Sequence, residues 1–425
     1  MQKQTTQMFD AAAYCRVGLP VEEAESLPPW CYTSTEFYHA EVDGIFMHAW
    51  NFLGRAERIP NPGDFFTVDL VGVPLLVVRD KAGRVRAFAN SCRHRGTQLV
   101  SGEGKCRQFI CPYHAWTYGL DGALRGGRGV SQIRGFNKAE NGLKEFKVDL
   151  WGGFVFVNFD DNSRSLRDWL GDLPEQMASY DCDKLVLCRR EEFEVACNWK
   201  CHIENSVEDY HVPHVHSYTL QKIQGGYEHL YPATLGNWLV MRERHAGTRA
   251  LLAEDLEHAF PPIATVKGHA AEGTNFVCLF PSTLLAFTVD SMWYIELYPQ
   301  GPHATKLVVG MCFPASTVKR SDFREKSQYY YRRWVRAVGE DNGITELQLK
   351  GLRSPFARAG RITNLEPLIP QMGRWWIDRV LNGHERLSVD RETRECVRGS
   401  QHNEYGPDEE GRENGPNKEG RPDSL

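Results

Sequence analysis

Two short segments of the chain place cysteine and histidine at spacings that suit a metal centre. Cys92 and His94 lie in the segment SCRHRG, and Cys111 and His114 lie in the segment CPYHAW. Each segment supplies one thiolate and one imidazole, which are ligands for a soft or borderline metal. A zinc ion with Cys₂His₂ ligands fits this residue set. A [2Fe–2S] cluster also fits, with both cysteines on one iron and both histidines on the other, and the mixed pairs favour it.

A later segment, NWKCHIENSVEDYHVPHVH, is rich in carboxylates and imidazoles. Glu204, Glu208 and His211 are spaced i, i+4, i+7 and would share one face of a helix. Pro213 is expected to end this helix near His211, so that His216 returns through a turn. Two imidazoles and one carboxylate form the facial triad of non-heme Fe(II) oxygenases, which leaves positions open for reactants. Taken alone, each histidine could also be an ordinary helix-end or surface residue.

The elements that must position these segments differ along the chain. Short β-rich runs bounded by glycine, proline, asparagine and aspartate predict a small all-β domain around the first two segments. The expected strands are Asp64–Leu70, Val73–Val78, Val85–Ala89, Gln108–Cys111 and Gly153–Phe159. The run Asn275–Tyr298 predicts neighbouring strands of an antiparallel sheet, and helices are expected over 37–52, 320–350 and 366–382. The fold class is therefore α+β, with a small all-β domain and a larger domain whose antiparallel sheet is flanked by helices.

Composition excludes several classes of protein. The 425 residues include 50 Lys and Arg and 55 Asp and Glu, a net charge of −5, which disfavours binding to nucleic acid or to an anionic membrane through charge. No apolar run reaches the ~18–20 residues of a membrane helix, and no secretory signal is seen, so we expect a cytoplasmic protein. Twelve cysteines are too sparse for a disulfide scaffold. The glycine-rich loops that bind ATP or a nicotinamide dinucleotide are absent from the sequence.

The wider context of these segments resembles the oxygenase (alpha) component of the Rieske non-heme iron oxygenases. The pattern N-x-C-x-H-R-G begins at Asn90, and C-P-Y-H-x-W-x-Y-x-L-x-G begins at Cys111. The pattern N-W-K-x-x-x-E-N-x-x-[D/E]-x-Y-H-x-x-x-x-H begins at Asn198. The resemblance extends from about residue 25 to about residue 385 and includes aromatic-ring-hydroxylating dioxygenases and carnitine and betaine monooxygenases.

This resemblance implies a helix-grip-like catalytic domain, and together with the composition of the C-terminus it divides the chain into four segments. Residues 1–45 would pack on the catalytic domain, 46–160 would form the Rieske [2Fe–2S] domain, and 161–390 the catalytic domain with a mononuclear iron. Residues 391–425, almost entirely polar near the C-terminus, would be a disordered tail.

The resemblance also implies a third iron ligand from a late helix, several residues before a Glu-x-Gln. Asp341 lies five residues before Glu346 and is expected to join His211 and His216, with Glu340 as the alternative. Asp341 also suits a helix N-cap, which would be a purely structural role.

Electron transfer in the resembling family links the cluster of one subunit to the iron of its neighbour in a head-to-tail trimer. A carboxylate three residues before the first iron histidine makes this link, and here that residue is Glu208. Glutamate at this position resembles the pattern of some carnitine and glycine-betaine monooxygenases. It therefore weakly favours an N-methylated compound as the substrate. Asn198, the first residue of the pattern that contains both iron histidines, is also expected to be a catalytic residue.

The expected activity is that of a terminal oxygenase, which uses O₂ and electrons to hydroxylate a small molecule. The products would be a cis-diol, a phenol, or a hydroxymethyl group that leaves as formaldehyde. Electrons from NAD(P)H would come through a separate flavin or iron–sulfur reductase, directly or through a ferredoxin. A homotrimer is expected, with or without a β subunit.

Candidate residues of the substrate pocket come from the iron segment and from the late sheet. They are Asn205, Val207, Tyr210, Tyr218, Leu220, Phe280, Phe287 and Trp293. Their aromatic rings could enclose a quaternary ammonium, stack on an aromatic substrate, or simply belong to the core.

Two other classes of protein stay open on the residues alone. A Rieske electron-transfer protein would contain about two iron atoms per chain, against about three for an oxygenase. A zinc-stabilised binding module would contain no iron.

Overall fold

The computed structural model describes residues 7–220 and 228–383. The predicted tail 391–425 and the last residues of the segment 161–390 lie outside this range. None of the described helices has the length and apolar character that a membrane span needs.

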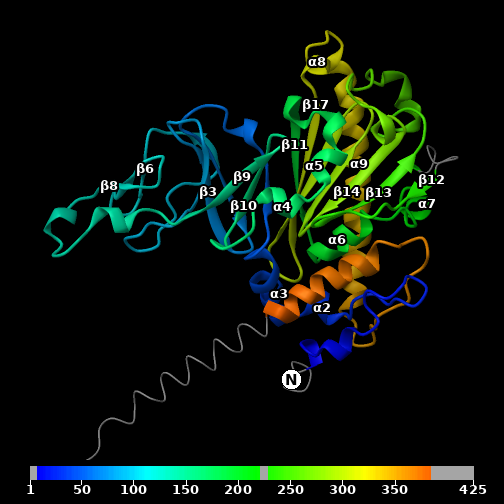
Figure 1. Ribbon diagram of the computed structural model, residues 1–425, viewed down its shortest axis with the longest axis horizontal. Helices are drawn as coiled ribbons and strands as arrows, with labels where there is room; N and C mark the ends of the chain where they lie inside the picture. Colours follow the sequence, from blue (N-terminus) through cyan, green and yellow to red (C-terminus); the bar gives the residue numbers. More distant parts are fainter. Residues whose placement is uncertain (1–6, 221–227, 384–425) are drawn as a thin grey trace, which may run out of the picture. The chain divides into compact units, whose positions relative to one another are not determined.

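The first part of the structure is a β domain made of two antiparallel sheets (Figure 1). The seven-stranded sheet has the order β1-β10-β9-β4-β3-β2-β5, and the three-stranded sheet has the order β6-β7-β8. Its strands are β1 (Asn51–Arg55), β2 (Asp64–Leu70), β3 (Val73–Arg79), β4 (Val85–Ala89), β5 (Glu103–Lys105), β6 (Phe109–Ile110), β7 (Thr117–Tyr118), β8 (Leu124–Gly126), β9 (Glu145–Trp151) and β10 (Phe154–Asn158). The prediction of a small all-β domain is therefore confirmed, and the bounds of β2 and β4 agree with the expected strands.

The second part is built on a seven-stranded antiparallel sheet with the order β11-β17-β16-β15-β14-β13-β12. Its strands are β11 (Leu185–Val195), β12 (Glu228–Leu230), β13 (Trp238–Arg244), β14 (Gly273–Leu279), β15 (Thr283–Phe287), β16 (Met292–Pro299) and β17 (Thr305–Pro314). Three consecutive hairpins, β14 to β17, confirm the antiparallel sheet expected over Asn275–Tyr298.

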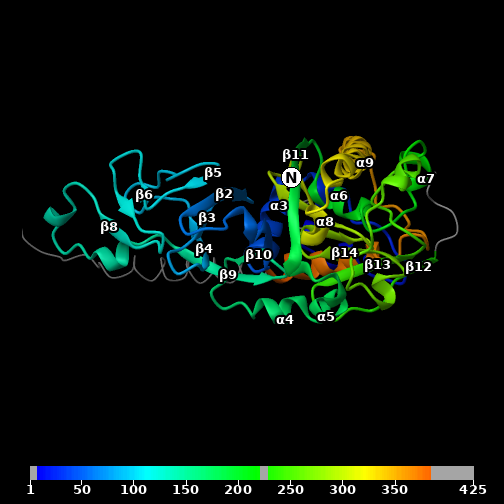
Figure 2. The same cartoon turned by 90° about the horizontal axis from the view of Figure 1, so that it is seen from above.

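Helices cover both faces of this sheet. The α-helices are α2 (Trp30–Thr33), α3 (Thr35–Glu41), α4 (Leu166–Leu170), α5 (Leu173–Gln176), α6 (Trp199–Asn205), α7 (Val212–Val215), α8 (Ala315–Val318) and α9 (Phe323–Leu352), and residues 369–383 are also helical. Short 3₁₀ helices are η1 (Ala11–Tyr14), η3 (Ala56–Arg58), η4 (Val130–Gln132), η5 (Lys138–Asn141), η6 (Ala178–Tyr180), η7 (Cys182–Lys184), η9 (Ala253–His258) and η10 (Gly268–Ala270), and η2 (Val42–Phe46) is a π-helix. Figure 2 shows α6 and α9 on one side of the sheet and α4 and α5 on the other.

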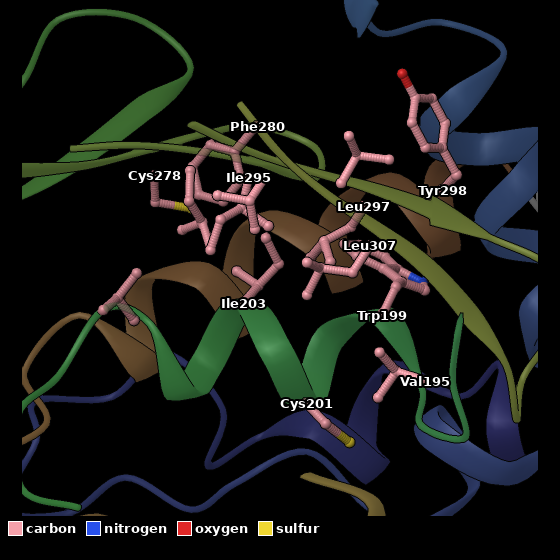
Figure 3. Close-up of a cluster of buried hydrophobic side chains, with 14 of the residues drawn as sticks. Val195, Trp199, Cys201, Ile203, Cys278, Phe280, Ile295, Leu297, Tyr298 and Leu307 are labelled. Atoms are coloured by element: carbon pink, nitrogen blue, oxygen red, sulfur yellow. The ribbon is translucent and has the colours of Figure 1, made fainter. Parts of the chain in front are cut away.

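The two faces of the sheet belong to different hydrophobic cores because side chains alternate along a strand. Leu284, Ala286 and Ile295 face α6 and α9, and Figure 3 shows Ile203 of α6 turned towards Ile295. Leu285 and Tyr294 face the opposite core, which contains residues of α4, α5, β1 and β10. The first of these faces supplies most of the sheet residues at the candidate site, although Val277 and Leu285 of the second face also adjoin it.

The helix expected over 37–52 is shorter than predicted. Helical structure ends at Phe46, and Asn51–Arg55 forms β1, which pairs with β10 and is buried along its whole length. Pairing and burial in the sheet therefore outweigh the helical periodicity of this stretch.

Candidate active site and metal centres

Helix α6 is held at its start by Asn198. The Asn198 side chain accepts a hydrogen bond from the Lys200 backbone nitrogen at 3.1 Å and donates to the carbonyl oxygens of Tyr32 and Pro302. This is the N-cap arrangement that stabilises the first turn of a helix. Asn198 is fully buried and does not line the cavity described below, so its contacts are those of a residue that positions α6.

The predicted helix through His211 is wrong. Helix α6 ends at Asn205, and Pro213 lies in the first turn of α7, whose N-cap is His211. Proline is tolerated in a first turn because the backbone N–H that it lacks has no partner there. Glu204 therefore does not share a face with Glu208 and His211, and it accepts a hydrogen bond from the Tyr32 hydroxyl at 2.6 Å.

His211 and His216 lie at the two ends of α7, and Asp341 reaches them from α9. The Asp341 Oδ1 atom lies 3.0 Å from His216 Nε2 and 3.6 Å from His211 Nε2. Asn205 donates a hydrogen bond to the same oxygen at 3.0 Å. Burial opposes ionisation of Asp341, but the neighbouring imidazoles hold the pKa of this carboxyl below its ordinary value. Two imidazole nitrogens and one carboxylate oxygen, all within 4.8 Å of one another, fit a ferrous ion with open positions.

Each of the two imidazoles also contacts a further carboxylate through its Nδ1 atom. Glu208 Oε1 lies 2.7 Å from His211 Nδ1, and Glu340 Oε2 lies 2.6 Å from His216 Nδ1. Glu340 also accepts a hydrogen bond from the Thr219 hydroxyl at 2.7 Å. Such contacts fix the proton on Nδ1 and leave Nε2 free for a metal. This geometry favours Asp341 over Glu340 as the third ligand.

A cavity of about 120 Å³ opens beside the triad. For comparison, an engineered apolar cavity of about 150 Å³ binds benzene, so this cavity suits a small molecule. Its lining combines polar and apolar groups. The described lining residues are Asn205, Ser206, Glu208, Asp209, His211, Val212, His216, Leu220, Met241, Glu243, Arg249, Phe276, Val277, Leu284, Leu285, Ala286, Trp293, Ile295, Arg333, Trp334, Ala337, Val338 and Asp341.

Of the predicted pocket residues, the cavity is lined by Asn205, Leu220 and Trp293. The others, Val207, Tyr210, Tyr218, Phe280 and Phe287, lie elsewhere. Phe287 faces the opposite core, since it is one residue out of step with Ala286. Phe280 stacks on Trp375 with ring centroids 4.2 Å apart.

Charged residues of the lining were missed by the sequence analysis. Asp209 and Glu243 lie 3.2 Å and 3.7 Å from His229 Nε2 and form a second acidic group beside the triad. Arg249 and Arg333 bring positive charge to the same cavity. A signal existed for Arg333, because it lies eight residues before Asp341 and so falls on the same face of a helix.

The four cysteine and histidine residues of the β domain lie in two similar turns. The Cys92 carbonyl accepts a hydrogen bond from Gly96, and the Cys111 carbonyl accepts one from Ala115. Gly96 and Ala115 both have positive φ angles, of 74° and 56°, so each turn closes through a left-handed residue. Both cysteines are buried.

His94 and His114 project from these turns towards solvent. Their rings are exposed, with centroids 4.7 Å apart, and Trp116 stacks on His94 at 4.9 Å. In the described part of the chain, the ligand atoms of Cys92, His94, Cys111 and His114 do not all lie within 4.8 Å of one another. One zinc ion would need closer ligands, whereas a two-iron cluster separates its cysteines from its histidines. The donor set therefore fits a [2Fe–2S] cluster.

The buried Tyr118 hydroxyl lies beside this group. It accepts a hydrogen bond from the Arg93 backbone nitrogen at 3.0 Å and lies 3.3 Å from Cys92 Sγ, to which it would donate when that sulfur is a metal-bound thiolate. A hydrogen bond to a cluster sulfur stabilises the reduced state. We expect Tyr118→Phe to lower the reduction potential by tens of millivolts, measured by redox titration of the visible spectrum. Tyr113→Phe is the control and should keep the wild-type potential. An unchanged potential in Tyr118→Phe would contradict a hydrogen bond to the cluster.

A stability prediction arises from Glu204. Burial raises the pKa of Glu204 from an ordinary value of 4.5 to about 7, although the hydrogen bond from Tyr32 and the charge of Lys200 act to lower it. Between these values the folded chain holds a proton that the unfolded chain releases, so this group's contribution to stability falls as pH rises from 4.5 to 7. We expect Glu204→Gln to stabilise the protein at pH 8, by roughly 1–3 kcal/mol, with the gain vanishing near pH 4.5. Thermal unfolding across this range measures the effect, and a gain that does not depend on pH would refute it.

Known proteins match both parts of the chain. Residues 49–137 match the Rieske [2Fe–2S] domain, and residues 182–382 match the ring hydroxylating alpha subunit, catalytic domain. The chloroplastic choline monooxygenase of Atriplex hortensis is 32% identical over 351 residues, which cover 81% of this chain and 75% of that protein. The carnitine monooxygenase oxygenase subunit of Acinetobacter pittii (strain PHEA-2) is 33% identical over 218 residues, 51% of this chain and 58% of that protein.

Solved structures share the fold. The quaternary ammonium Rieske monooxygenase CntA in complex with gamma-butyrobetaine has a TM-score of 0.68 and 25% identity, covering 84% of this chain and 95% of that one. Naphthalene 1,2-dioxygenase with indole bound has a TM-score of 0.71 and 21% identity, covering 84% and 92%.

The chain therefore belongs to the Rieske non-heme iron oxygenases, as an oxygenase (alpha) component. It is a terminal oxygenase with a Rieske [2Fe–2S] cluster and a mononuclear iron, which hydroxylates a small molecule with O₂ and electrons from a separate reductase. The zinc-stabilised module and the simple electron-transfer protein are thereby excluded.

Proposed function

We propose that the enzyme hydroxylates a small N-methyl ammonium compound, at an N-methyl group or at a carbon near the nitrogen. Relatives named for choline, carnitine and glycine betaine support this class over the aromatic acids that were the other expectation. When an N-methyl group is hydroxylated, the hydroxymethyl product loses formaldehyde and leaves a demethylated amine. Each turnover combines one O₂ with two electrons and two protons and releases one water.

The observation that carries this proposal is the cavity beside His211, His216 and Asp341. We assign these three residues as the ligands of the ferrous ion, which supplies O₂ activation when bound. Cys92, His94, Cys111 and His114 are assigned to the cluster, which supplies electrons one at a time. The cavity volume of about 120 Å³ suits a compact substrate.

The lining of the cavity also suits a cation. Three carboxylates line the cavity, those of Glu208, Asp209 and Glu243. Asp209 and Glu243 both also contact His229 Nε2. Phe276 and Trp293 offer aromatic surface, with ring centroids 5.9 Å apart. Carboxylates and aromatic faces are the two groups that attract a quaternary ammonium without a hydrogen bond.

Electron transfer between subunits is part of the proposal. The exposed rings of His94 and His114 offer the cluster to a partner, and Glu208 contacts His211 on the side away from the triad. We assign Glu208 as the bridge from the iron histidine to a neighbour's cluster histidine in a head-to-tail homotrimer. A ferredoxin, a β subunit and a cytoplasmic location stay predictions.

The test is a product screen with the iron-loaded enzyme, NADH and a compatible reductase. Choline, glycine betaine, carnitine and γ-butyrobetaine would be compared with benzoate and its ring-substituted analogues. We expect substrate-dependent O₂ uptake with the N-methyl compounds, with formaldehyde or an aldehyde as product. Turnover of aromatic acids alone would reverse the assignment of the substrate class.

A further inference from the structure

One buried cation of the cavity has no counter-ion in contact among the residues that the structure describes. Arg333 lies on α9, on the face that also carries Ala337, Val338 and Asp341 into the cavity lining. Only 5% of its surface is exposed. Among residues 7–220 and 228–383, no side chain forms an ion pair with its guanidinium within 4.0 Å, and its buried Nε atom has no hydrogen-bond acceptor.

Two fully buried cations of the described chain, Lys200 and Arg55, have charged or carbonyl partners, although the Nε atom of Arg55 also has no acceptor. Lys200 pairs with the buried Glu41. Arg55 donates to the carbonyl oxygens of Gly152, Cys182 and Leu185. A buried charge without such partners is costly, so Arg333 differs from the arginines that stabilise the fold.

Aromatic rings hold the guanidinium in place. Its carbon lies 3.6 Å from the ring centroid of Trp334 and 5.2 Å from that of Trp293. Burial lowers the pKa of Arg333 to about 9, while Asp341 and Glu243 act in the opposite direction. The side chain therefore remains charged at neutral pH, and within the described part of the chain its Nε donor is left without an acceptor.

The position of Arg333 relative to the triad limits the length of a substrate that contacts both. Arg333 precedes Asp341 by eight residues, which places the two Cα atoms about 12 Å apart along α9. A substrate that reaches from the triad to the Arg333 side chain therefore has its oxidised carbon at one end and a group that binds a guanidinium at the other. Arg249 lines the same cavity and adds positive charge to it.

We propose that Arg333 binds the carboxylate of the substrate, so that the enzyme selects zwitterionic ammonium carboxylates over N-methyl cations that lack an acid. This inference rests on the proposed function and narrows its substrate class. A guanidinium and a carboxylate match in two parallel hydrogen bonds, which a hydroxyl or an ester cannot reproduce. The cavity's carboxylates and aromatic rings take the ammonium end, and Arg333 takes the acid end.

The test compares substrates that differ only in the acid. Glycine betaine and γ-butyrobetaine are each measured against their methyl esters, which keep the trimethylammonium group. Turnover is followed by substrate-dependent O₂ uptake and product analysis, and binding by calorimetry with the iron-loaded enzyme under anaerobic conditions. For the wild-type enzyme we expect esterification to reduce kcat/KM and affinity on the order of 100-fold.

Variants of α9 then assign the preference to Arg333. Arg333→Gln is expected to reduce the acid-to-ester ratio to near one, and Arg333→Lys to give an intermediate ratio because it keeps the charge without the planar fork. Arg336→Gln, an exposed arginine on the same helix, is the matched control and should keep the wild-type ratio.

The outcomes separate this inference from the proposed function. Equal use of acids and esters by the wild-type enzyme overturns the role of Arg333 while N-methyl oxidation stands. Its role is overturned in the same way if Arg333→Lys and Arg333→Gln keep the wild-type ratio. Failure to oxidise or bind any N-methyl compound overturns both proposals. If Arg333→Gln does not fold, which loss of the visible cluster spectrum would show, the wild-type ratio and Arg333→Lys decide.

Discussion

Asp341→Ala should yield a protein that keeps its [2Fe–2S] cluster and loses its mononuclear iron. Among residues 7–220 and 228–383, Asp341 Oδ1 is the carboxylate oxygen that lies beside the Nε2 atoms of both His211 and His216. Two imidazoles alone hold a ferrous ion weakly, because the site then has no anionic ligand. We expect the iron content to fall from about three to about two atoms per chain and product formation to fall to background. Metal analysis, the visible spectrum and the turnover assay measure the three quantities.

The matched control for this experiment is Glu340→Ala. Glu340 contacts the Nδ1 atom of His216 and the Thr219 hydroxyl, so its loss should loosen the imidazole and leave the ligand set intact. The expected cost is roughly 10–100-fold in iron affinity, which is typical of contacts behind a metal ligand and which excess ferrous ion would overcome. If added iron restored Asp341→Ala and not Glu340→Ala, the assignment of the third ligand would be reversed.

The predicted cluster residues depend on short-range spacing, whereas Asp341 was predicted from a resemblance over a late helix. Cys92 and His94 lie in one turn, and Cys111 and His114 lie in another, so each pair of donors is placed by a few residues of local backbone. The strand Asp64–Leu70 could likewise be predicted because turn residues bound it at both ends.

Local spacing did not determine the path of the chain between Glu204 and His216. A proline after a helical pattern can end one helix or begin the next, and the two outcomes differ in which side chains share a face. Here the break falls after Asn205, and the result separates Glu204, which contacts Tyr32, from Glu208, which contacts His211. Tyr32 is distant in sequence, so no local pattern could indicate its contact.

The substrate cavity was the least predictable part because it depends on which face of the sheet each residue occupies. A shift of one residue along a strand moves a side chain to the other face. Phe287 was therefore placed wrongly, whereas Ala286 beside it lines the cavity. Arg333 lies on an arginine-rich helix, and only its spacing of eight residues to Asp341 distinguishes it in the sequence from the exposed Arg336.

Glu208 is placed to connect His211 with a partner outside the iron site. Glu208 accepts a hydrogen bond from the His211 backbone nitrogen at 3.1 Å, and its other oxygen lies 2.7 Å from His211 Nδ1. Its side chain is 10% exposed, so it is accessible at the edge of the site. Glutamine has the same size and can keep one contact to His211, but it carries no charge and cannot hold a proton between two imidazoles.

We therefore expect Glu208→Gln to load both metal centres and to stop turnover. The reductase should still reduce the cluster, since Cys92, His94, Cys111 and His114 are untouched. With substrate and O₂ present, reoxidation of the reduced cluster should slow by at least about 100-fold, the upper range for contacts behind a metal ligand. Stopped-flow absorbance of the cluster, metal analysis and product formation measure these steps in one preparation.

The control for this experiment is Glu257→Gln, which changes an exposed glutamate, with 79% of its side chain accessible, and should behave as the wild type. The pattern of defects matters more than the loss of activity. Loss of iron from Glu208→Gln would mean that Glu208 only orients His211, whereas a loaded site with a slow cluster places it in the electron path. Near-normal reoxidation with both centres loaded would remove Glu208 from that path, and electrons would then have to reach the iron through another contact of His211 or His216.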